Sequence, residues 1–330
     1  MPRASRILAA DPATNAIDGR VVWSPVKSLW LGSMMVLALV AGPLTFRWDA
    51  AIMSGLLTAA TLCFGHSVGL HRLLIHRSFE CPKWLEYCMV YVGVLVGLGG
   101  PRRMLYMHDI RDWAQRQSDC HPFFIHQSKM IKDAVWNLHC ECQLTHAPVF
   151  CPEENVANDL FYKLLDRYWI AAQLPVAALL YLIGGWSWVV WGICVRVTIS
   201  SVGHWLVGYI AHNTGSQDWI VEGAAVQGFN LSGLGILTMG EAWHNNHHAF
   251  PDSARLGIKR GQNDPGWWLL CGLHALRLVR NLTLPDDLPE RPELRAVTGM
   301  SPRPETVKIE RNSKSLGGKL ARVPVGGIRD

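Results

Sequence analysis

The chain has 330 residues, 14 histidines and a formal net charge of +5, which is too small to indicate a nucleic-acid partner. Its length would allow two soluble domains, but the apolar residues are concentrated in long uncharged runs. This pattern favours an integral membrane protein over the buried helices of a large soluble core. Nine cysteines without a CxxC pair predict free thiols and no disulfide framework.

Residues 1–27 contain the breakers Asp11-Pro12 and Ser24-Pro25, and we expect a flexible cytoplasmic N-terminus there. Four apolar runs follow, and a membrane span needs about 20 such residues. We interpret the runs as spans at about 28–46, 50–70, 168–184 and 186–212. The turns expected at Gly42-Pro43 and Gly184-Gly185 arrange these spans as two hairpins.

Basic residues are concentrated before the first span, whereas the tips of both hairpins carry almost no charge. The positive-inside rule therefore places the N-terminus, residues 72–167 and the C-terminal region in the cytoplasm. The glycine-rich apolar run 84–100 is short for a span, and we expect a helix at the membrane interface or re-entering the bilayer. Arg102 and Arg103 follow this run. We interpret them as anchors at the membrane interface, in preference to contacts with an anionic substrate head group.

The remaining segments predict a cytoplasmic cap. An amphipathic helix is expected over 131–144, with Cys140-Glu141-Cys142 on its surface and not in a metal knuckle. Residues 299–330 are rich in Gly, Pro and Ser and are expected to form a disordered tail. The predicted class is an all-α integral membrane protein, with a membrane domain at 28–298 whose helical cap holds a histidine-rich metal site.

The histidines support that metal site. His244, His247 and His248 are spaced i, i+3, i+4, which places three imidazoles on one helical face. A solvated surface turn is the other reading of this cluster alone. Further histidines end the second span (His66, His71, His76), begin the segment at His108, and end the fourth span (His204, His212). Four distant segments thus bring imidazoles to one membrane depth, and a shared metal site explains them together.

With these residues in place, the sequence resembles the membrane-bound fatty acid desaturases, especially the acyl-CoA desaturase type. His71-Arg72-Leu73-Leu74-Ile75-His76 resembles the first histidine box of that family, HxxxxH, and His244-Asn245-Asn246-His247-His248 resembles the third, HNxHH. His212 matches an additional family histidine, and the likeness covers about 50–285. The resemblance implies two non-haem iron ions, O2 as co-substrate and two electrons.

The second histidine box departs from the family pattern HRxHH. His108 occupies its first position, but Arg111 and Asp112 occupy the last two. Arg111 is permanently cationic and cannot bind iron. Asp112 lies i+4 from His108 and would offer a carboxylate ligand, although a solvated Asp–Arg face explains it equally well. His121 is a second weak candidate. The family asparagine before His212 is Gly208 here.

The resemblance implies an O2-dependent desaturase that forms a cis double bond in a long-chain acyl substrate, with acyl-CoA as the expected carrier. The metal ligands expected are His71, His76, His108, His212, His244, His247 and His248, with Asp112 and His121 as weaker candidates. No haem or flavin fingerprint is present, so we expect a separate electron-transfer protein as donor, and membrane lipid as surroundings. A related di-iron lipid hydroxylase, or a non-catalytic metal- or lipid-binding relative, is the alternative.

Overall fold

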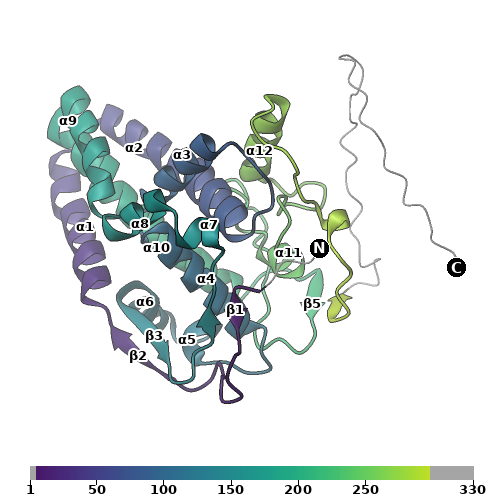
Figure 1. The fold of residues 1–330 in the computed structure, drawn as a ribbon. Coiled ribbons are helices and arrows are strands. Elements are labelled where there is room, and N and C mark those ends of the chain that lie inside the picture. Colours follow the sequence, from purple (N-terminus) through teal and green to yellow (C-terminus); the bar gives the residue numbers. More distant parts are fainter. Residues whose placement is uncertain (1–4, 298–330) are drawn as a thin grey trace, which may run out of the picture.

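The computed structural model describes residues 5–297, so the disordered tail predicted for 299–330 lies outside the described residues. The chain is mostly helical (Figure 1). The α-helices are α1 (Pro25–Leu44), α2 (Trp48–Ala60), α3 (Lys83–Val94), α4 (Pro101–Gln115), α5 (Pro122–Ile125), α6 (Met130–His139), α7 (Glu154–Ala157), α8 (Leu160–Arg167), α9 (Leu174–Val189), α10 (Arg196–Ala211), α11 (His244–Ala249) and α12 (Pro265–Ala275). The π-helices are η1 (Thr61–Ile75) and η3 (Val190–Val195), and the 3₁₀ turns are η2 (Ala171–Gln173) and η4 (Pro285–Asp287).

The prediction of an all-α chain is wrong in detail, because the described residues include three antiparallel strand pairs. The pairs are β1 (Ile7–Leu8) with β4 (Val149–Phe150), β2 (Gly19–Trp23) with β3 (Cys140–Leu144), and β5 (Trp219–Val221) with β6 (Leu294–Ala296). Strand β2 lies where the sequence predicts a flexible segment. Strand β3 replaces the end of the helix expected over 131–144, since pairing with β2 satisfies its backbone groups.

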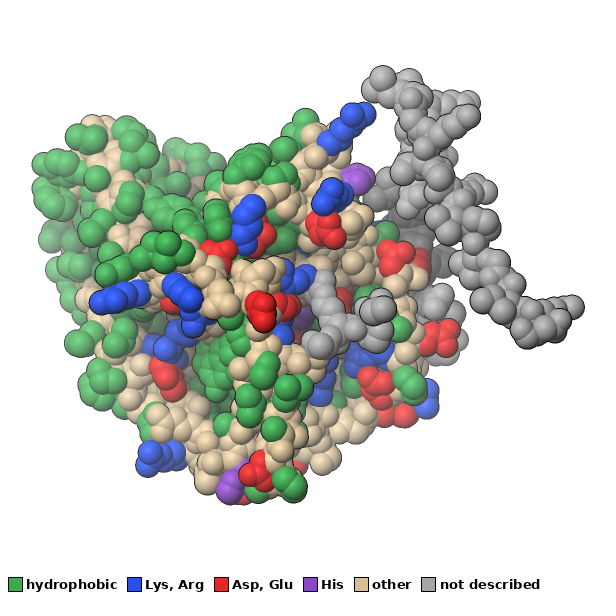
Figure 2. Space-filling model, in the orientation of Figure 1, with side chains coloured by type: hydrophobic (Ala, Val, Ile, Leu, Met, Phe, Trp, Pro, Cys, Tyr) green, Lys and Arg blue, Asp and Glu red, His purple; other side chains and the backbone are tan. Residues whose placement is uncertain are grey.

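Three helices in the described part of the chain are long and apolar enough to cross a membrane, namely Pro25–Leu44, Trp48–Ile75 and Ala171–Ala211. Helices α1, α2 and α9 stand together in Figure 1, and hydrophobic side chains cover this side of the molecule in Figure 2. Many of these side chains are exposed, including Leu39, Leu44 and Leu182. An apolar exposed belt of this kind fits contact with lipid.

The segment Ala171–Ala211 is not one straight helix. Gly185 has a non-helical backbone, with φ +65° and ψ −157°, a conformation that glycine adopts without a Cβ clash. Beyond this residue the chain turns back, because Arg196 Nη2 donates to Gln173 Oε1 at 2.6 Å although 23 residues separate them. Arg196 is buried, and Gly192 O accepts a second bond from its Nε at 2.6 Å. The neighbouring helices thus satisfy a cation within an apolar segment.

The π-helix η1 determines how the first histidine box faces the protein. In a π-helix the backbone bonds run from residue i to i+5, so residues five apart lie one turn apart. His76 N donates to His71 O at 2.9 Å, a bond of this type, and both imidazoles therefore lie on one face. Helix α3 packs against η1 at Gly65, where a Cβ atom would meet Gly93 N at 2.4 Å. These close contacts fix the depth at which η1 carries its histidines.

Candidate metal centre

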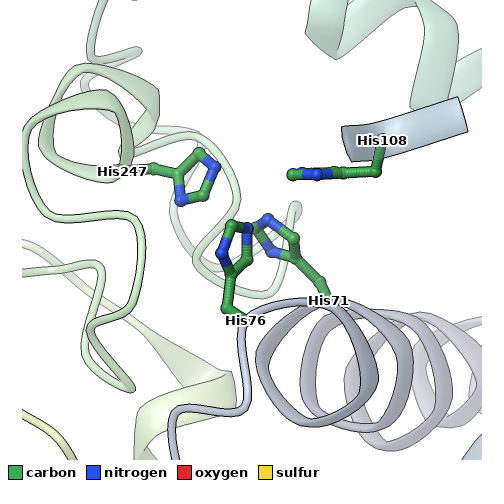
Figure 3. A group of neighbouring side chains, drawn as sticks. All are labelled: His71, His76, His108 and His247. Carbon is green, nitrogen blue, oxygen red and sulfur yellow. The ribbon is translucent and has the colours of Figure 1, made fainter. Parts of the chain in front are cut away.

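Four histidines form a first group at the end of η1. His71 and His76 come from η1 and its end, His108 from α4 and His247 from α11. Each offers a ring nitrogen, and these four atoms lie within 4.8 Å of one another. Figure 3 shows the four rings pointing toward a common centre from three separate parts of the chain. Converging imidazoles at this spacing fit a divalent transition metal ion.

Three more histidines, His212, His244 and His248, form a second group whose ligand atoms also lie within 4.8 Å of one another. The Nε2 atom of His244 is 3.1 Å from Nε2 of His212 and 3.1 Å from Nε2 of His248. Nitrogen atoms bound to one metal at about 2.1 Å lie at such separations, so this group also fits a metal ion. His212 is oriented by its Nδ1, which donates to Gly208 O at 2.7 Å.

Helix α11 contributes to both groups. The i+4 spacing places His244 and His248 in the second group, and the i+3 position places His247 in the first. The asparagines between them anchor the helix to the cap, because Asn245 Nδ2 donates to Trp219 O at 2.8 Å and Asn246 Nδ2 to Leu256 O at 2.8 Å. The two groups are therefore adjacent and rigidly connected.

Carboxylates lie against the imidazoles of the first group. Glu241 Oε2 is 2.8 Å from His71 Nδ1, and Asp252 Oδ1 is 3.5 Å from His76 Nδ1. Ser67 Oγ donates to the other Glu241 oxygen at 2.6 Å. Carboxylates in this position fix the orientation of metal-binding imidazoles. Burial would raise the pKa of Glu241, but its contact with His71 and the charge of Arg72 lower it to about 2, so the carboxylate is ionised.

The imidazoles of α11 are held neutral. Burial, followed by the neighbouring histidines, lowers the pKa values of His244 and His247 well below the usual value. Burial also lowers the pKa of His248 to about 4, although Asp112 opposes the shift. A neutral imidazole has the free lone pair that a metal requires. The α11 histidines are therefore in their metal-binding form near neutral pH.

A buried ion pair between Arg72 of η1 and Asp264, the residue before α12, holds the third histidine box in place. Arg72 and Asp264 are both buried, and Arg72 Nη2 donates to Asp264 Oδ1 at 2.7 Å. The other carboxylate oxygen of Asp264 accepts from the backbone N–H groups of Leu256 and Gly257 at 2.9 and 3.1 Å. Breaking such a buried pair would leave an uncompensated charge, so the first box and the loop after α11 depend on each other.

The weaker candidates are placed differently. Asp112 Oδ1 lies 3.9 Å from His108 Nδ1, and Asp112 lines a small cavity together with His247 and His248. His121 belongs to neither histidine group, and its Nδ1 instead accepts from Phe123 N at 3.2 Å at the start of α5. Arg111 points to Asn137, donating from Nη2 to Oδ1 at 3.0 Å.

The sequence reasoning did not single out Glu241 or the buried Gln115, whose Nε2 lies 3.3 Å from His212 Nε2. Glu241 lies three residues before His244, so its proximity to the third box was a usable signal. Nothing in the sequence marks Gln115, because its role depends on how α4 packs against the end of α10.

These two imidazole groups, carried in part by segments of membrane-spanning length, are the features expected of a membrane-associated metalloprotein. The chain is 34% identical to an sn-1 stearoyl-lipid 9-desaturase of Anabaena variabilis, over 78% of this chain and 94% of the relative. It is 33% identical to an acyl-CoA C20 Delta5-desaturase of Anemone leveillei, over 80% and 83%. It is 31% identical to an sn-2 palmitoyl-lipid 9-desaturase of Nostoc, over 78% and 89%. No protein-family model matches the chain.

The chain belongs to the fatty acid desaturase family, as the sequence predicts, and is an oxidoreductase of that family. The names of these relatives include both lipid-linked and CoA-linked acyl substrates. An acyl lipid is therefore the substrate class that the family implies.

Proposed function

We propose that the protein is an O2-dependent fatty acyl desaturase that introduces a cis double bond into a long-chain acyl substrate at a non-haem di-iron centre. The division of the histidines into adjacent groups of four and three, joined by α11, is the observation that carries this proposal. One ion cannot bind all of these imidazoles, whereas two neighbouring ions can. The proposed ligands are His71, His76, His108 and His247 for one iron, and His212, His244 and His248 for the other.

Bound iron would supply the O2 activation that removal of an unactivated hydrogen requires. The residues of this chain orient the ligands and exclude water. Glu241 fixes the His71 ring, and the burial of α11 keeps its imidazoles neutral. The packing of η1 against α3 sets the depth of the η1 histidines. We propose that a separate electron-transfer protein donates the electrons and that CoA carries the acyl chain. A lipid-linked acyl chain is the alternative, and supplying the two substrates separately distinguishes them.

We also propose that the chain crosses the membrane four times in two hairpins, with the metal centre on the cytoplasmic side. The reversal at Gly185 supports two segments within Ala171–Ala211. The basic residues that precede α1 support the orientation. A substrate would then have its polar head in the cytoplasm and its acyl chain in the apolar part of the protein.

The test is lipid analysis after expression, combined with iron analysis of the purified protein. We expect about two irons per chain after anaerobic reconstitution, and new cis-unsaturated acyl chains that depend on O2. Supplying stearoyl-CoA or a stearoyl lipid separately identifies the carrier. Hydroxylated chains would point to the hydroxylase alternative. A folded, reconstituted protein with less than about one iron would contradict the di-iron proposal.

A further inference from the structure

Helix α12 has an apolar outer face. Between Pro265 and Ala275 the sequence contains no Asp, Glu, Lys or Arg. Four exposed residues follow one another at the helical spacing i, i+4, i+7 and i+8, and we call them the outer face: Trp268, Gly272, Ala275 and Leu276. Trp268 is 52% exposed and Leu276 is 70% exposed. A Cβ atom at Gly272 would meet nothing within 4 Å among residues 5–297, so the described part of the chain leaves this face uncovered.

The inner side of α12 packs against η1 and α3. One buried cluster joins the three helices, and it contains Val68, Leu85, Met89, Trp267 and Leu270. The backbone ties α12 to α3 as well, because Glu80 and Arg280 exchange two N–H···O bonds of 2.9 Å. Glu80 precedes α3 and Arg280 follows α12, and Figure 1 shows the two helices standing beside each other. The outer face therefore belongs to a helix with a fixed position on the second membrane-length segment.

The packing partners of α12 define its depth. The membrane-length segment Trp48–Ile75 has 28 residues, whereas the hydrocarbon core of a bilayer needs about 20. A crossing that begins at Trp48 therefore leaves the hydrocarbon near Val68, which packs in the cluster with α12. Trp84 of α3, next to the clustered Leu85, is exposed as well. Tryptophan side chains concentrate at the membrane–water interface, and the outer face brings Trp268 to this same depth.

Basic side chains follow the outer face. Arg277 comes directly after Leu276 and is exposed, and Arg280 is exposed and pairs with Glu80 at 3.0 Å. Figure 2 shows hydrophobic side chains over α12 with Lys or Arg side chains at its end. An apolar face that ends in cationic groups matches the boundary between the acyl chains of a leaflet and its anionic phosphate groups.

We propose that the outer face of α12 lies in the lipid interface on the side of the histidine groups and anchors the C-terminal part of the cap to the bilayer. The partner is lipid, because the face extends the exposed apolar belt of the membrane-length segments, on one of which α12 packs. This placement rests on a crossing by Trp48–Ile75 and is independent of the reaction at the metal centre. A second copy of the chain and open water are the other occupants, and the test separates them.

The anchor is connected to the histidine boxes through Asp264. At the start of α12, Asp264 Oδ1 accepts from Trp267 N at 2.9 Å, and the same oxygen accepts from Arg72 Nη2 of η1 at 2.7 Å. The other oxygen accepts from the backbone N–H groups of Leu256 and Gly257 in the loop after α11. Lipid contact at α12 therefore fixes the first box and the loop after the third box at one height relative to the bilayer.

The experiment is site-directed spin labelling of the full-length, metal-free protein in vesicles of phosphatidylcholine and phosphatidylserine. The background has three cysteines replaced by serine, namely Cys88, Cys151 and Cys271, and its remaining label uptake gives the baseline. A nitroxide is placed on the outer face at Gly272→Cys or at Leu276→Cys. Its collision rates with O2 and with a water-soluble nickel chelate are measured by EPR, because O2 concentrates in lipid and the chelate in water. Thermal unfolding in detergent shows whether each labelled variant keeps the fold of the background.

Two matched controls bracket the expected depth. Gly55→Cys on α2, where a Cβ atom also meets nothing within 4 Å, represents the lipid, and Glu222→Cys represents the exposed surface of the cap. We expect labels at Gly272→Cys and Leu276→Cys to collide with O2 several-fold more often than the label at Glu222→Cys. They should collide with the nickel chelate several-fold less often, which corresponds to a depth between the two controls.

The other outcomes contradict the lipid contact in distinguishable ways. Nickel access equal to that of Glu222→Cys would place α12 in water. Low access to both reagents would show that a protein, such as a second copy of the chain, covers the face. A label at Gly55→Cys that meets the nickel chelate would overturn the crossing and the lipid contact together. Because the readings require neither iron nor product, a failure of the desaturase proposal would leave them unchanged.

Discussion

Glu241 connects the first metal group to η1, and its substitution should weaken metal binding without unfolding the protein. In Glu241→Gln the neutral amide no longer stabilises the His71 ring at 2.8 Å, and an amide NH₂ can turn toward it. We expect iron affinity of the first group to fall about 10- to 100-fold, measured by anaerobic titration of the metal-free protein. Glu222→Gln is the control, because Glu222 is exposed and pairs with Arg295. Equal affinity in both variants would refute the role of Glu241.

Asp112 is the residue at which the ligand assignment is most open to test. Its Oδ1 lies 3.9 Å from His108 Nδ1, too far for a hydrogen bond but close enough for both to contact one ion. If Asp112 is a ligand, Asp112→Ala should lose iron and most desaturase activity, as measured by metal analysis and product formation. Asp119→Ala, which changes an exposed carboxylate after the same helix, should retain both. Full iron content and activity in Asp112→Ala would show that the ligand role is wrong.

At the scale of elements, the contact between η1 and α3 leaves no space for a side chain. A Cβ atom at Gly65 would meet the backbone of Gly93 at 2.4 Å, whereas one at Gly55, earlier in the same long helix, would meet nothing within 4 Å. Overpacking of this kind costs about 1–3 kcal/mol. We expect Gly65→Ala to unfold at a lower temperature and to bind less iron, as thermal melts and metal analysis would show. Gly55→Ala should match wild type, and equal melting of both variants would contradict the packing argument.

The N-terminal strand β1 is attached close to the metal centre by Arg6. This side chain bonds Glu153 at 2.8 Å, Asp109 at 3.1 Å and Ile75 O at 2.9 Å, so it joins the start of β1 to the end of η1 and the middle of α4. Burial would raise the pKa of Glu153, but the bonds to Arg6 and the charge of Arg77 lower it to about 2.

A depressed carboxyl pKa contributes stability above the unfolded value of about 4.3, and this contribution is lost as the pH falls toward about 2. We therefore expect Arg6→Gln to melt below wild type at pH 6 and the difference to narrow at pH 3, in thermal melts of the metal-free protein. Arg20→Gln on β2, which reaches Gln143 at 3.4 Å near the surface, should differ little from wild type at either pH. A difference that is independent of pH would contradict the role assigned to Glu153.

The elements also show how far the sequence can predict this structure. The spacing of His71, His76 and the α11 histidines indicates that their imidazoles share faces, because i+3, i+4 and i+5 offsets are local properties of helices, and the structure places them in two histidine groups, whereas their role as metal ligands stays a prediction. Strand β3 was missed, since its partner β2 lies more than 100 residues earlier and the local pattern is amphipathic. Gln115 was missed for the same reason, because its position beside His212 depends on the packing of α4 against the end of α10 and on no sequence motif.

At the scale of the whole molecule, the arrangement in the membrane predicts which residues each side can reach. Asp49 lies in the first turn of α2, next to the turn between α1 and α2, and is half exposed, while Cys151 is exposed just after β4 in the cap. With four crossings and a cytoplasmic metal centre, these positions lie on opposite sides of the membrane. In intact cells, a membrane-impermeant maleimide should label Asp49→Cys, in a background with Cys88 and Cys151 replaced by Ser.

The reciprocal variant completes this experiment. In a chain that retains Cys151, with Cys88 replaced by Ser and Asp49 unchanged, labelling should appear only after the membrane is permeabilised. A chain that crossed the membrane only twice would have its hairpin tips in other positions. In the reverse orientation, Cys151 would be labelled in intact cells, and Asp49→Cys only after permeabilisation. Labelling of Cys151 in intact cells would therefore overturn the cytoplasmic placement, and with it the side from which the proposed electron-transfer protein would reach the histidine groups. Because the proposed iron ligands lie on the cap and at the helix ends next to it, the labelling of Cys151 also tests which side the acyl head group would occupy.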